Sequence, residues 1–316
     1  MTALVVAENL TRRFDERGWF RRAPPVQAVT DVSLSLDRGE AVALVGESGS
    51  GKTTLGRMLL GLLPPSAGRV RFDGVDLASA SAAQRRQLRR RMQIVFQDPQ
   101  SSLDPRRTVG TQIADGLEIH NIVPPADRRA RVSELLAQVG LNSVHADRYP
   151  HEFSGGQRQR IGIARALATE PEFLLADEPV SALDLSVQAQ VLELLVDLRE
   201  RLGLALLFIS HDLAVVRGLC ERVAVMYLGR VMETGSVAQV FTAPRHPYTV
   251  ALLSALPRLD AAERRTRILL SGDPPSPADP PSGCVFRTRC PIAIAECAAV
   301  VPALTNGVAC IRVGQA

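Results

Sequence analysis

The chain has 316 residues with 37 basic and 33 acidic side chains, so its formal net charge is only +4. Hydrophobic residues make up 46% and charged residues 22%, which excludes wholesale disorder and predicts one large domain or two smaller ones. No apolar run approaches the ~18–20 residues that span a bilayer. The N-terminal sequence MTALVVAENL lacks a basic region and contains Glu8, so we expect no cleaved signal peptide and a chain on the cytosolic side.

The first third of the chain is rich in strand-like segments. We predict an antiparallel β layer from Leu4–Arg13, Val26–Leu36 and Gly68–Phe72, beside a buried strand at Ala41–Val45. A helix is predicted at Thr53–Leu63.

The rest of the chain alternates between helices and strands of a mainly parallel sheet. Between Gly110 and Tyr149 the sequence is helical and arginine-rich without a good strand, which predicts an inserted helical subdomain. The predicted buried strands are Gln93–Phe96, Glu172–Ala176 and Ala205–Ile209, and the predicted helices are Gly155–Ala168, Ser186–Leu202 and Asp212–Leu219. Residues 270–283 are rich in proline and predict a stiff linker.

The most specific pattern is GESGSGKT at Gly46–Thr53, which follows a predicted strand and opens a predicted helix. It matches the phosphate-binding P-loop in its expected context. Its glycines let successive backbone N–H groups turn toward phosphate oxygens, and the helix N-terminus adds its dipole. Lys52 is the only lysine beside 36 arginines, and its slim ammonium suits the β- and γ-phosphates. A chance glycine-rich turn is the less favoured interpretation.

Two adjacent carboxylates end the apolar segment Phe173–Glu178. Asp177 is suited to hold Mg²⁺, and Glu178 is suited to orient or deprotonate an attacking water. His211, after the next predicted strand, can donate a hydrogen bond to a γ-phosphate. Such residues are usually structural or solvated when they occur alone, but together with a P-loop they indicate nucleotide hydrolysis.

The segment FSGGQRQR at Phe153–Arg160 completes a set of motifs by which residues 1–240 resemble the ABC ATPase family. The other motifs follow in order: Walker A at Gly46–Thr53, the Q-loop at Gln97, Walker B at Phe173–Asp177, the D-loop at Ser181–Asp184 and the H-loop at His211. The resemblance implies an α/β P-loop NTPase cassette with a mainly parallel core sheet, an antiparallel β layer and a helical subdomain at about residues 98–165.

The resemblance also implies a bound ATP with Mg²⁺ and a role for each motif residue. Implied nucleotide contacts are Phe14 against adenine and Gly46, Glu47, Ser48, Gly49, Ser50, Gly51, Lys52, Thr53, Thr54, Gln97, Ser154, Gly155, Gly156, Gln157, Asp177, Asp184 and His211. Implied Mg²⁺ ligands are Thr53, Gln97 and Asp177, and implied catalytic residues are Glu178, His211 and Gln97. Because the P-loop already holds the phosphates, the second anion-binding helix start at Ser154 implies a site completed by another cassette that pairs head to tail.

Further segments are similar to the ATPases of oligopeptide, dipeptide and nickel importers, most of all the F-type member of the D/F pair. They are FQDPQSSLDPR at Phe96–Arg106, GRVMETG at Gly229–Gly235, HPYT at His246–Thr249 and the cysteine-rich tail. The similarity implies ATP-driven solute import with a D-type paralogue or second copy, two permeases and an extracytoplasmic solute-binding protein, with this chain peripheral on the cytoplasmic face of the inner membrane. Peptides are favoured as solute, with nickel or another small solute as alternatives.

Two other classes of protein are less consistent with the sequence. The arginines of Arg85–Arg91 suggest a soluble ABC protein that acts on nucleic acid. This cluster has no interleaved aromatic residues, which favours a solvated helix face. We therefore expect no nucleic-acid partner. A small-molecule kinase would use the P-loop but leaves SGGQ and His211 without a role.

Four of the five cysteines lie in the last 33 residues: Cys284, Cys290, Cys297 and Cys310, separated by five, six and twelve residues. In a reducing compartment such a group suits Zn²⁺ or an iron–sulfur cluster before disulfides. The wide spacing contains none of the short C-x₂₋₄-C pairs that are typical of structural zinc sites. The resemblance implies a structural [4Fe–4S] cluster, and free thiols are the remaining alternative. We therefore expect an ABC domain at 1–240, a helix and proline-rich linker at 241–283 and a cysteine-rich extension at 284–316.

Overall fold

The computed structural model describes residues 3–15, 24–256 and 268–313, so part of the predicted segment 241–283 lies outside the described residues. The chain divides into two compact units. Unit 1 comprises Met1–Leu4, Leu36–Glu40 and Ser79–Ile209, and unit 2 comprises Val5–Ser35, Ala41–Ala78 and Ser210–Ala316.

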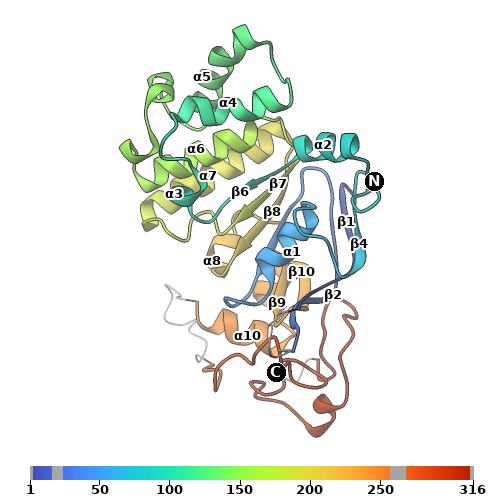
Figure 1. Ribbon diagram of the computed structural model, residues 1–316. Coiled ribbons are helices and arrows are strands. Elements are labelled where there is room, and N and C mark those ends of the chain that lie inside the picture. Colours follow the sequence, from blue (N-terminus) through green and yellow to red (C-terminus); the bar gives the residue numbers. More distant parts are fainter. Residues whose placement is uncertain (1–2, 16–23, 257–267, 314–316) are drawn as a thin grey trace. The chain divides into compact units, whose positions relative to one another are not determined.

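Unit 1 is built on three neighbouring parallel strands (Figure 1). They are β6 (Met92–Val95), β7 (Phe173–Asp177) and β8 (Ala205–Ser210), with β7 between the other two. Every residue of β7 and β8 is buried, which explains why both read as continuous apolar runs without alternation. The predicted parallel strands are confirmed here with shifts of one residue at their ends.

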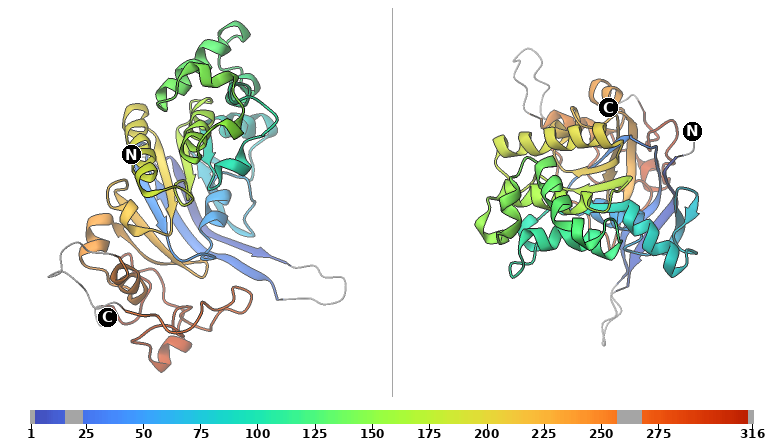
Figure 2. Two further views of the ribbon diagram at one scale, coloured as in Figure 1. Left: turned by 90° about the vertical axis from the view of Figure 1, so that its left-hand side faces the viewer. Right: turned by 90° about the horizontal axis from the view of Figure 1, so that it is seen from above.

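Helices make up the rest of unit 1, and the described segment 98–165 contains no strand. The α-helices are α2 (Ala82–Arg91), α3 (Pro99–Ser102), α4 (Val109–Ile119), α5 (Arg128–Gln138), α6 (Gly155–Leu167) and α7 (Leu185–Leu202). Short 3₁₀ turns lie at Pro125–Asp127, Ser143–Asp147 and Pro150–Glu152. α6 packs against α3, α4, α5 and α7. Figure 2 shows α4, α5 and α6 in green tones and α7 in yellow from two further directions.

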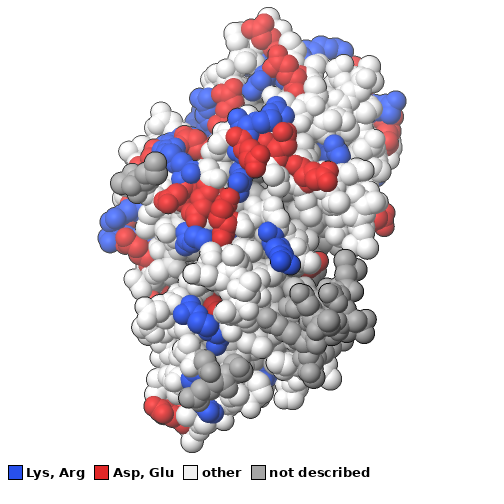
Figure 3. Space-filling model, turned by 180° about the vertical axis from the view of Figure 1, so that it is seen from behind, with Lys and Arg blue, Asp and Glu red and all other residues white. Residues whose placement is uncertain are grey.

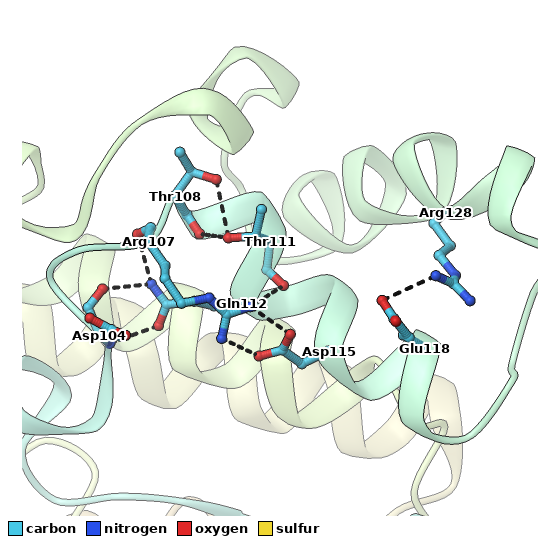
Figure 4. Close-up of polar contacts among 8 residues, drawn as sticks. All are labelled: Asp104, Arg107, Thr108, Thr111, Gln112, Asp115, Glu118 and Arg128. Carbon is cyan, nitrogen blue, oxygen red and sulfur yellow. Dashed lines mark hydrogen bonds and ion pairs between the residues drawn. The ribbon is translucent and has the colours of Figure 1, made fainter.

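A polar network holds the loop that leads into α4 (Figure 4). The buried Gln112 side chain accepts a hydrogen bond from the backbone N–H of Asp104 at 2.8 Å and donates to the carbonyls of Asp104 and Arg107 at 2.9 and 3.0 Å. Arg107 forms a two-pronged ion pair with Asp115 of α4 at 2.6 and 2.8 Å. A buried amide that meets three backbone groups fixes this loop against the helix.

Two of the arginines of α2 pair with acidic residues. Arg90 pairs with Glu170 at 3.2 Å, and Arg91 makes ion-paired hydrogen bonds with Glu172. The hydrogen bond from Arg91 lowers the pKa of the Glu172 carboxyl, and Arg38 adds to this effect. Figure 3 shows basic and acidic side chains interspersed on the face that it draws. The charges of Arg90 and Arg91 are thus compensated locally.

Unit 2 contains two groups of strands. β3 (Ala41–Val45) pairs in parallel with β9 (Arg222–Tyr227), which pairs antiparallel with β10 (Arg230–Ser236). A separate antiparallel sheet has the order β2-β1-β4-β5, from Val26–Leu36, Val5–Phe14, Ala67–Phe72 and Val75–Asp76. The antiparallel layer is confirmed, but β10 makes the first group mixed, and neither β9 nor β10 was predicted from the sequence.

Two predicted helices are shorter than expected. α1 (Lys52–Leu59) stops four residues before the predicted end because Gly61 turns the chain with a φ of +64°. α8 (Leu213–Val216) comprises only four residues. Two further helices follow β10, α9 (Val237–Thr242) and α10 (Pro247–Ser254).

The C-terminal tail has little regular structure and docks onto β10 through backbone hydrogen bonds. Thr234 N–H donates to Gly307 at 2.8 Å, and Ala309 N–H donates to Met232 at 2.8 Å. The buried Glu233 carboxylate accepts from the backbone N–H groups of Arg245 and His246 at 2.9 and 3.0 Å. The tail is therefore held on unit 2 by the edge of β10, and Arg245 adds a hydrogen bond from its guanidinium to the Asn306 carbonyl at 2.7 Å.

Two glycines of α6 test the packing of this helix against α7. A Cβ atom on Gly156 would lie 2.2 Å from Cγ1 of Val187, whereas a Cβ atom on Gly162 would meet nothing within 4 Å. We expect Gly156→Ala to lower the free energy of unfolding by about 1–3 kcal/mol through overpacking. Gly162→Ala should raise it by about 0.5–1 kcal/mol through helix propensity. Urea denaturation of both variants measures this.

The double variant Gly156→Ala with Val187→Ala is the control, because it removes the side chain that clashes. The loss caused by Gly156→Ala should be smaller in this background. If Gly156→Ala lowers the free energy of unfolding equally in both backgrounds, the Val187 side chain does not exclude a side chain at position 156.

Candidate functional site

The loop between β3 and α1 has a backbone that only glycine can follow at two positions. Gly46 and Gly51 have φ angles of +153° and +101°. A Cβ atom would lie 2.1 Å from the Met226 carbonyl oxygen at Gly46 and 2.2 Å from the Ala28 carbonyl oxygen at Gly51. Gly51 is the N-cap of α1 and supplies no side chain to its first N–H groups. A helix start of this kind is suited to accept an anion.

The Lys52 ammonium lies inside this loop and is 4% exposed. Its Nζ donates to the carbonyl oxygens of Gly46 and Glu47 at 2.8 and 2.9 Å and lies 3.4 Å from Ser50 Oγ. The lysine thus joins both ends of the loop and places a positive charge among inward-turned backbone groups. The remaining predicted residues of this loop, Ser48, Gly49, Thr53 and Thr54, lie in the loop or in the first turn of α1.

In unit 1 the structure brings together a carboxylate and an amide that were predicted from separate motifs. Gln97 Nε2 donates to Glu178 Oε2 at 3.1 Å. Glu178 follows β7 with a φ of +45°, and its backbone N–H donates to the Ile209 carbonyl at 3.0 Å. Asp177, the last residue of β7, is 5% exposed. A non-glycine residue in the left-handed region costs free energy, and such strain often marks functional sites.

The SGGQ segment begins α6 with a complete capping box. Ser154 Oγ accepts from the Gln157 N–H at 3.3 Å, and Ser154 N–H donates to Gln157 Oε1 at 3.0 Å. Gly155 and Gly156 occupy the first two helical positions. The predicted helix start is confirmed, with its serine and glutamine side chains turned onto each other.

The other predicted site residues lie in both units. Asp184 is the N-cap of α7 in unit 1. His211 is an exposed residue of unit 2 that directly follows β8. Phe14 ends β1, and the Arg12 guanidinium lies 4.6 Å from its ring centroid. The P-loop and His211 therefore belong to unit 2, whereas Gln97, Asp177, Glu178 and SGGQ belong to unit 1.

All four C-terminal cysteines line one small pocket with a free volume of about 10 Å³. Arg287, Arg312 and the buried His246 line the same pocket. Burial raises the pKa of the Cys284 and Cys290 thiols, and it lowers the pKa of His246 to about 4. In the part of the chain that the structure describes, no group of three or more His, Cys, Asp or Glu side chains is arranged to hold a metal ion.

Sequence reasoning missed a contact between this tail and the P-loop. Arg289 Nη1 lies 2.7 Å from Glu47 Oε2, and their side chains are 9% and 27% exposed. The Glu47 N–H donates to the Tyr248 hydroxyl oxygen at 2.9 Å. Arg289 immediately precedes a cysteine of the pocket, and HPYT contains Tyr248, but neither local pattern points to a residue more than 200 positions away.

Comparisons with known proteins cover nearly the whole chain. Residues 29–181 match the family model described as ABC transporter, and residues 232–297 match the oligopeptide/dipeptide transporter C-terminal region. A peptide import ATP-binding protein of Brucella ovis is 57% identical over 96% of this chain and 94% of its own. The oligopeptide transport protein AppF of Bacillus subtilis is 51% identical over 89% and 87%. The dipeptide transport protein DppF of Escherichia coli is 48% identical over 99% and 95%.

Solved structures agree with this assignment. A dimeric ATP-binding cassette, MJ0796, bound to ADP and phosphate in a post-hydrolysis state, is 30% identical with a TM-score of 0.65 over 74% of this chain and 98% of its own. The CbiO1 cassette of Clostridium perfringens is 30% identical with a TM-score of 0.66 over 77% and 92%. Among the described residues, none of the helices combines the length and apolarity needed to cross a membrane. The chain belongs to the ATP-hydrolysing subunits of ABC transporters, in the group that carries the oligopeptide/dipeptide transporter C-terminal region.

Proposed function

We propose that this chain hydrolyses ATP to drive the import of di- or oligopeptides. The observation that carries the proposal is the match of residues 232–297 to the oligopeptide/dipeptide C-terminal region, in a chain that also holds a complete P-loop. The relatives in three genera are named for peptide, oligopeptide and dipeptide transport. A cassette that served another process would not need this C-terminal region.

The proposed assembly contains a second ATPase subunit, two permeases and an extracytoplasmic solute-binding protein. The second ATPase is a D-type paralogue, and this chain binds peripherally at the cytoplasmic face of the inner membrane. The dimeric state of MJ0796 supports the pairing of two cassettes. The capped helix start at Ser154 supports it as well, because its free amides suit the phosphates held by a partner's P-loop.

Each motif residue has a separate role in hydrolysis. Lys52 contacts the β- and γ-phosphates, and Glu178 orients the attacking water and accepts its proton while Gln97 holds the carboxylate. Mg²⁺, when bound, neutralises phosphate charge, and the hydroxyl, amide and carboxylate oxygens of Thr53, Gln97 and Asp177 are the donors that it prefers. His211 donates to the γ-phosphate, Phe14 stacks on adenine, and Asp184 contacts the nucleotide.

The cysteine-rich extension at 284–316 is proposed to hold a structural [4Fe–4S] cluster. Four cysteines that line one pocket support this role, and Arg287 and Arg312 supply positive charge against the negative thiolates. Thiolates bound to a cubane attach to four different irons, so they need not converge as closely as the ligands of one Zn²⁺. The ABC domain at 1–240 and the linker at 241–283 complete the proposed domain organisation.

Replacing the proposed general base tests the catalytic assignment. Glu178→Gln should keep ATP binding and lower turnover by about 10²–10⁴-fold, because the amide cannot accept the proton. The measurement is ATPase activity of the assembled transporter together with equilibrium ATP binding. Glu200→Gln, the same change at an exposed residue of α7, should leave both unchanged. Normal turnover of the Glu178 variant would contradict its role.

The single lysine can be tested by a change that keeps its charge. Lys52→Arg should reduce ATP affinity nearly as much as Lys52→Ala, because the loop carbonyls that surround Nζ leave no room for a planar guanidinium. Arg57→Lys, at an exposed position of the same helix, should have no effect. Retention of most ATP binding by the arginine variant would show that the loop does not select an ammonium.

Metal analysis tests the cluster. Protein purified without oxygen should be brown and contain about four irons per chain. Cys297→Ala should lose the iron, whereas Cys220→Ala, at a buried cysteine outside the pocket, should keep it. One zinc per chain in a colourless protein would replace the cluster by a zinc site, and absence of both metals would contradict metal binding altogether.

A further inference from the structure

Glu47, the second residue of the P-loop, is held by three different parts of unit 2. Its carbonyl oxygen accepts from Lys52 Nζ at 2.9 Å, inside the loop. Its backbone N–H donates to Tyr248 Oη at 2.9 Å, from α10. Its carboxylate accepts from Arg289 Nη1 at 2.7 Å, from the cysteine-rich tail. The conformation of this loop residue therefore depends on α10 and on the tail as well as on the loop itself.

Arg289 is buried where a charge needs a partner. Its side chain is 9% exposed, its Nη1 lies 3.5 Å from the Tyr227 hydroxyl, and its guanidinium lies 5.9 Å from the Tyr227 ring centroid. The buried Arg289 Nε has no hydrogen-bond partner. Burying a guanidinium costs free energy unless a carboxylate compensates its charge, and the Glu47 carboxylate does so here. The pair is more than a surface contact.

A cluster of three aromatic side chains packs beside this pair, and one of them, Phe286, belongs to the tail. The ring centroids of Tyr227 and Tyr248 lie 4.8 Å apart, and Phe286 lies 5.2 and 5.3 Å from them. All three side chains are almost fully buried. Packing of this kind fixes the tail backbone near Arg289 and limits the positions that its guanidinium can reach. The arginine is thus preorganised for Glu47.

The charge of Glu47 matters because its loop is a binding site for a polyanion. A carboxylate beside phosphate groups repels them, and the repulsion is strong where little water screens it. The Arg289 guanidinium compensates this charge and holds the carboxylate in an ion pair. Without Arg289, Glu47 would carry an uncompensated negative charge beside the loop carbonyl groups that bind Lys52.

We propose that Arg289 is a positioning residue for ATP binding. It neutralises Glu47 and fixes the start of the P-loop, so the cysteine-rich tail forms part of the ATP-binding machinery rather than a separate appendage. This inference rests on the proposed function, in which the P-loop binds ATP.

The test is the dissociation constant for Mg·ATP of the full chain, measured by calorimetry. Arg289→Met should weaken binding by about tenfold, since it leaves a carboxylate uncompensated beside the phosphates. Arg217→Met is the matched control, because Arg217 is an exposed arginine of the same unit outside the P-loop, α10 and the tail, and it should change affinity by less than about twofold. Arg289→Lys keeps the charge and one donor and should stay within about threefold of the unmodified chain.

The variant Arg289→Met with Glu47→Gln separates this role from simple support of the tail. If the uncompensated charge causes the loss, removing that charge should restore most of the affinity. If Arg289 merely supports the fold, the double variant should bind as weakly as Arg289→Met, and that result would overturn the inference. Unchanged affinity in Arg289→Met would overturn it as well. Thermal unfolding shows which variants remain folded. If Arg289→Met does not fold, Arg289→Lys decides the inference. Near-normal affinity of Arg289→Lys for Mg·ATP supports the inference, and a tenfold loss of this affinity overturns it.

Failure of the proposed function would look different. In that case the unmodified chain would not bind Mg·ATP, or Lys52→Ala would bind it as tightly as the unmodified chain. With ATP binding present and dependent on Lys52, the Arg289 variants decide the inference alone.

Discussion

The Lys52 ammonium inside its loop is the interaction on which the phosphate site depends. From the end of the loop it donates to the carbonyl oxygens of the first two loop residues, Gly46 and Glu47, and Lys52 is almost fully buried. A buried cation costs free energy unless its donors are satisfied, and here backbone carbonyls satisfy them without cancelling the positive charge. The loop therefore has a defined shape and a defined sign of charge before any phosphate binds. Gly46 and Gly51 are required because carbonyl oxygens of neighbouring strands occupy the space that their side chains would need.

The helix starts at Gly51 and Ser154, which we propose to bind phosphate, are prepared in different ways. α1 begins after Gly51, which leaves its first N–H groups without a side-chain cap. α6 begins at Ser154, whose side chain and that of Gln157 cap each other. The first arrangement suits a phosphate enclosed by the loop, and the second suits a phosphate that approaches a preformed, stable helix end from outside. This difference agrees with a nucleotide held by one cassette and covered by another.

The cysteine pocket and the P-loop are linked by neighbouring residues. Cys290 lines the pocket, and Arg289 beside it holds Glu47. Phe286 likewise lines the pocket and packs on Tyr227 and Tyr248, the latter being the residue that accepts from the Glu47 N–H. Adjacent residues cannot move independently, because the peptide bond between them is planar and its neighbours are packed. The order of the tail and the order of the phosphate loop are thus physically coupled.

The sequence by itself determined the parts of the site that are continuous in the chain. The P-loop, the start of α6 and the buried strand β7 could all be predicted, because glycine conformations, capping bonds and apolar runs act over a few residues. The strands β9 and β10 were missed, since their state depends on pairing with β3 and with each other. The sequence also named four cysteines as a group, but only the tertiary structure placed all of them around one pocket. Arg289 and Glu47 are 242 positions apart, and only the folded chain could pair them, because a buried guanidinium selects its carboxylate by distance in space and no local pattern records that distance.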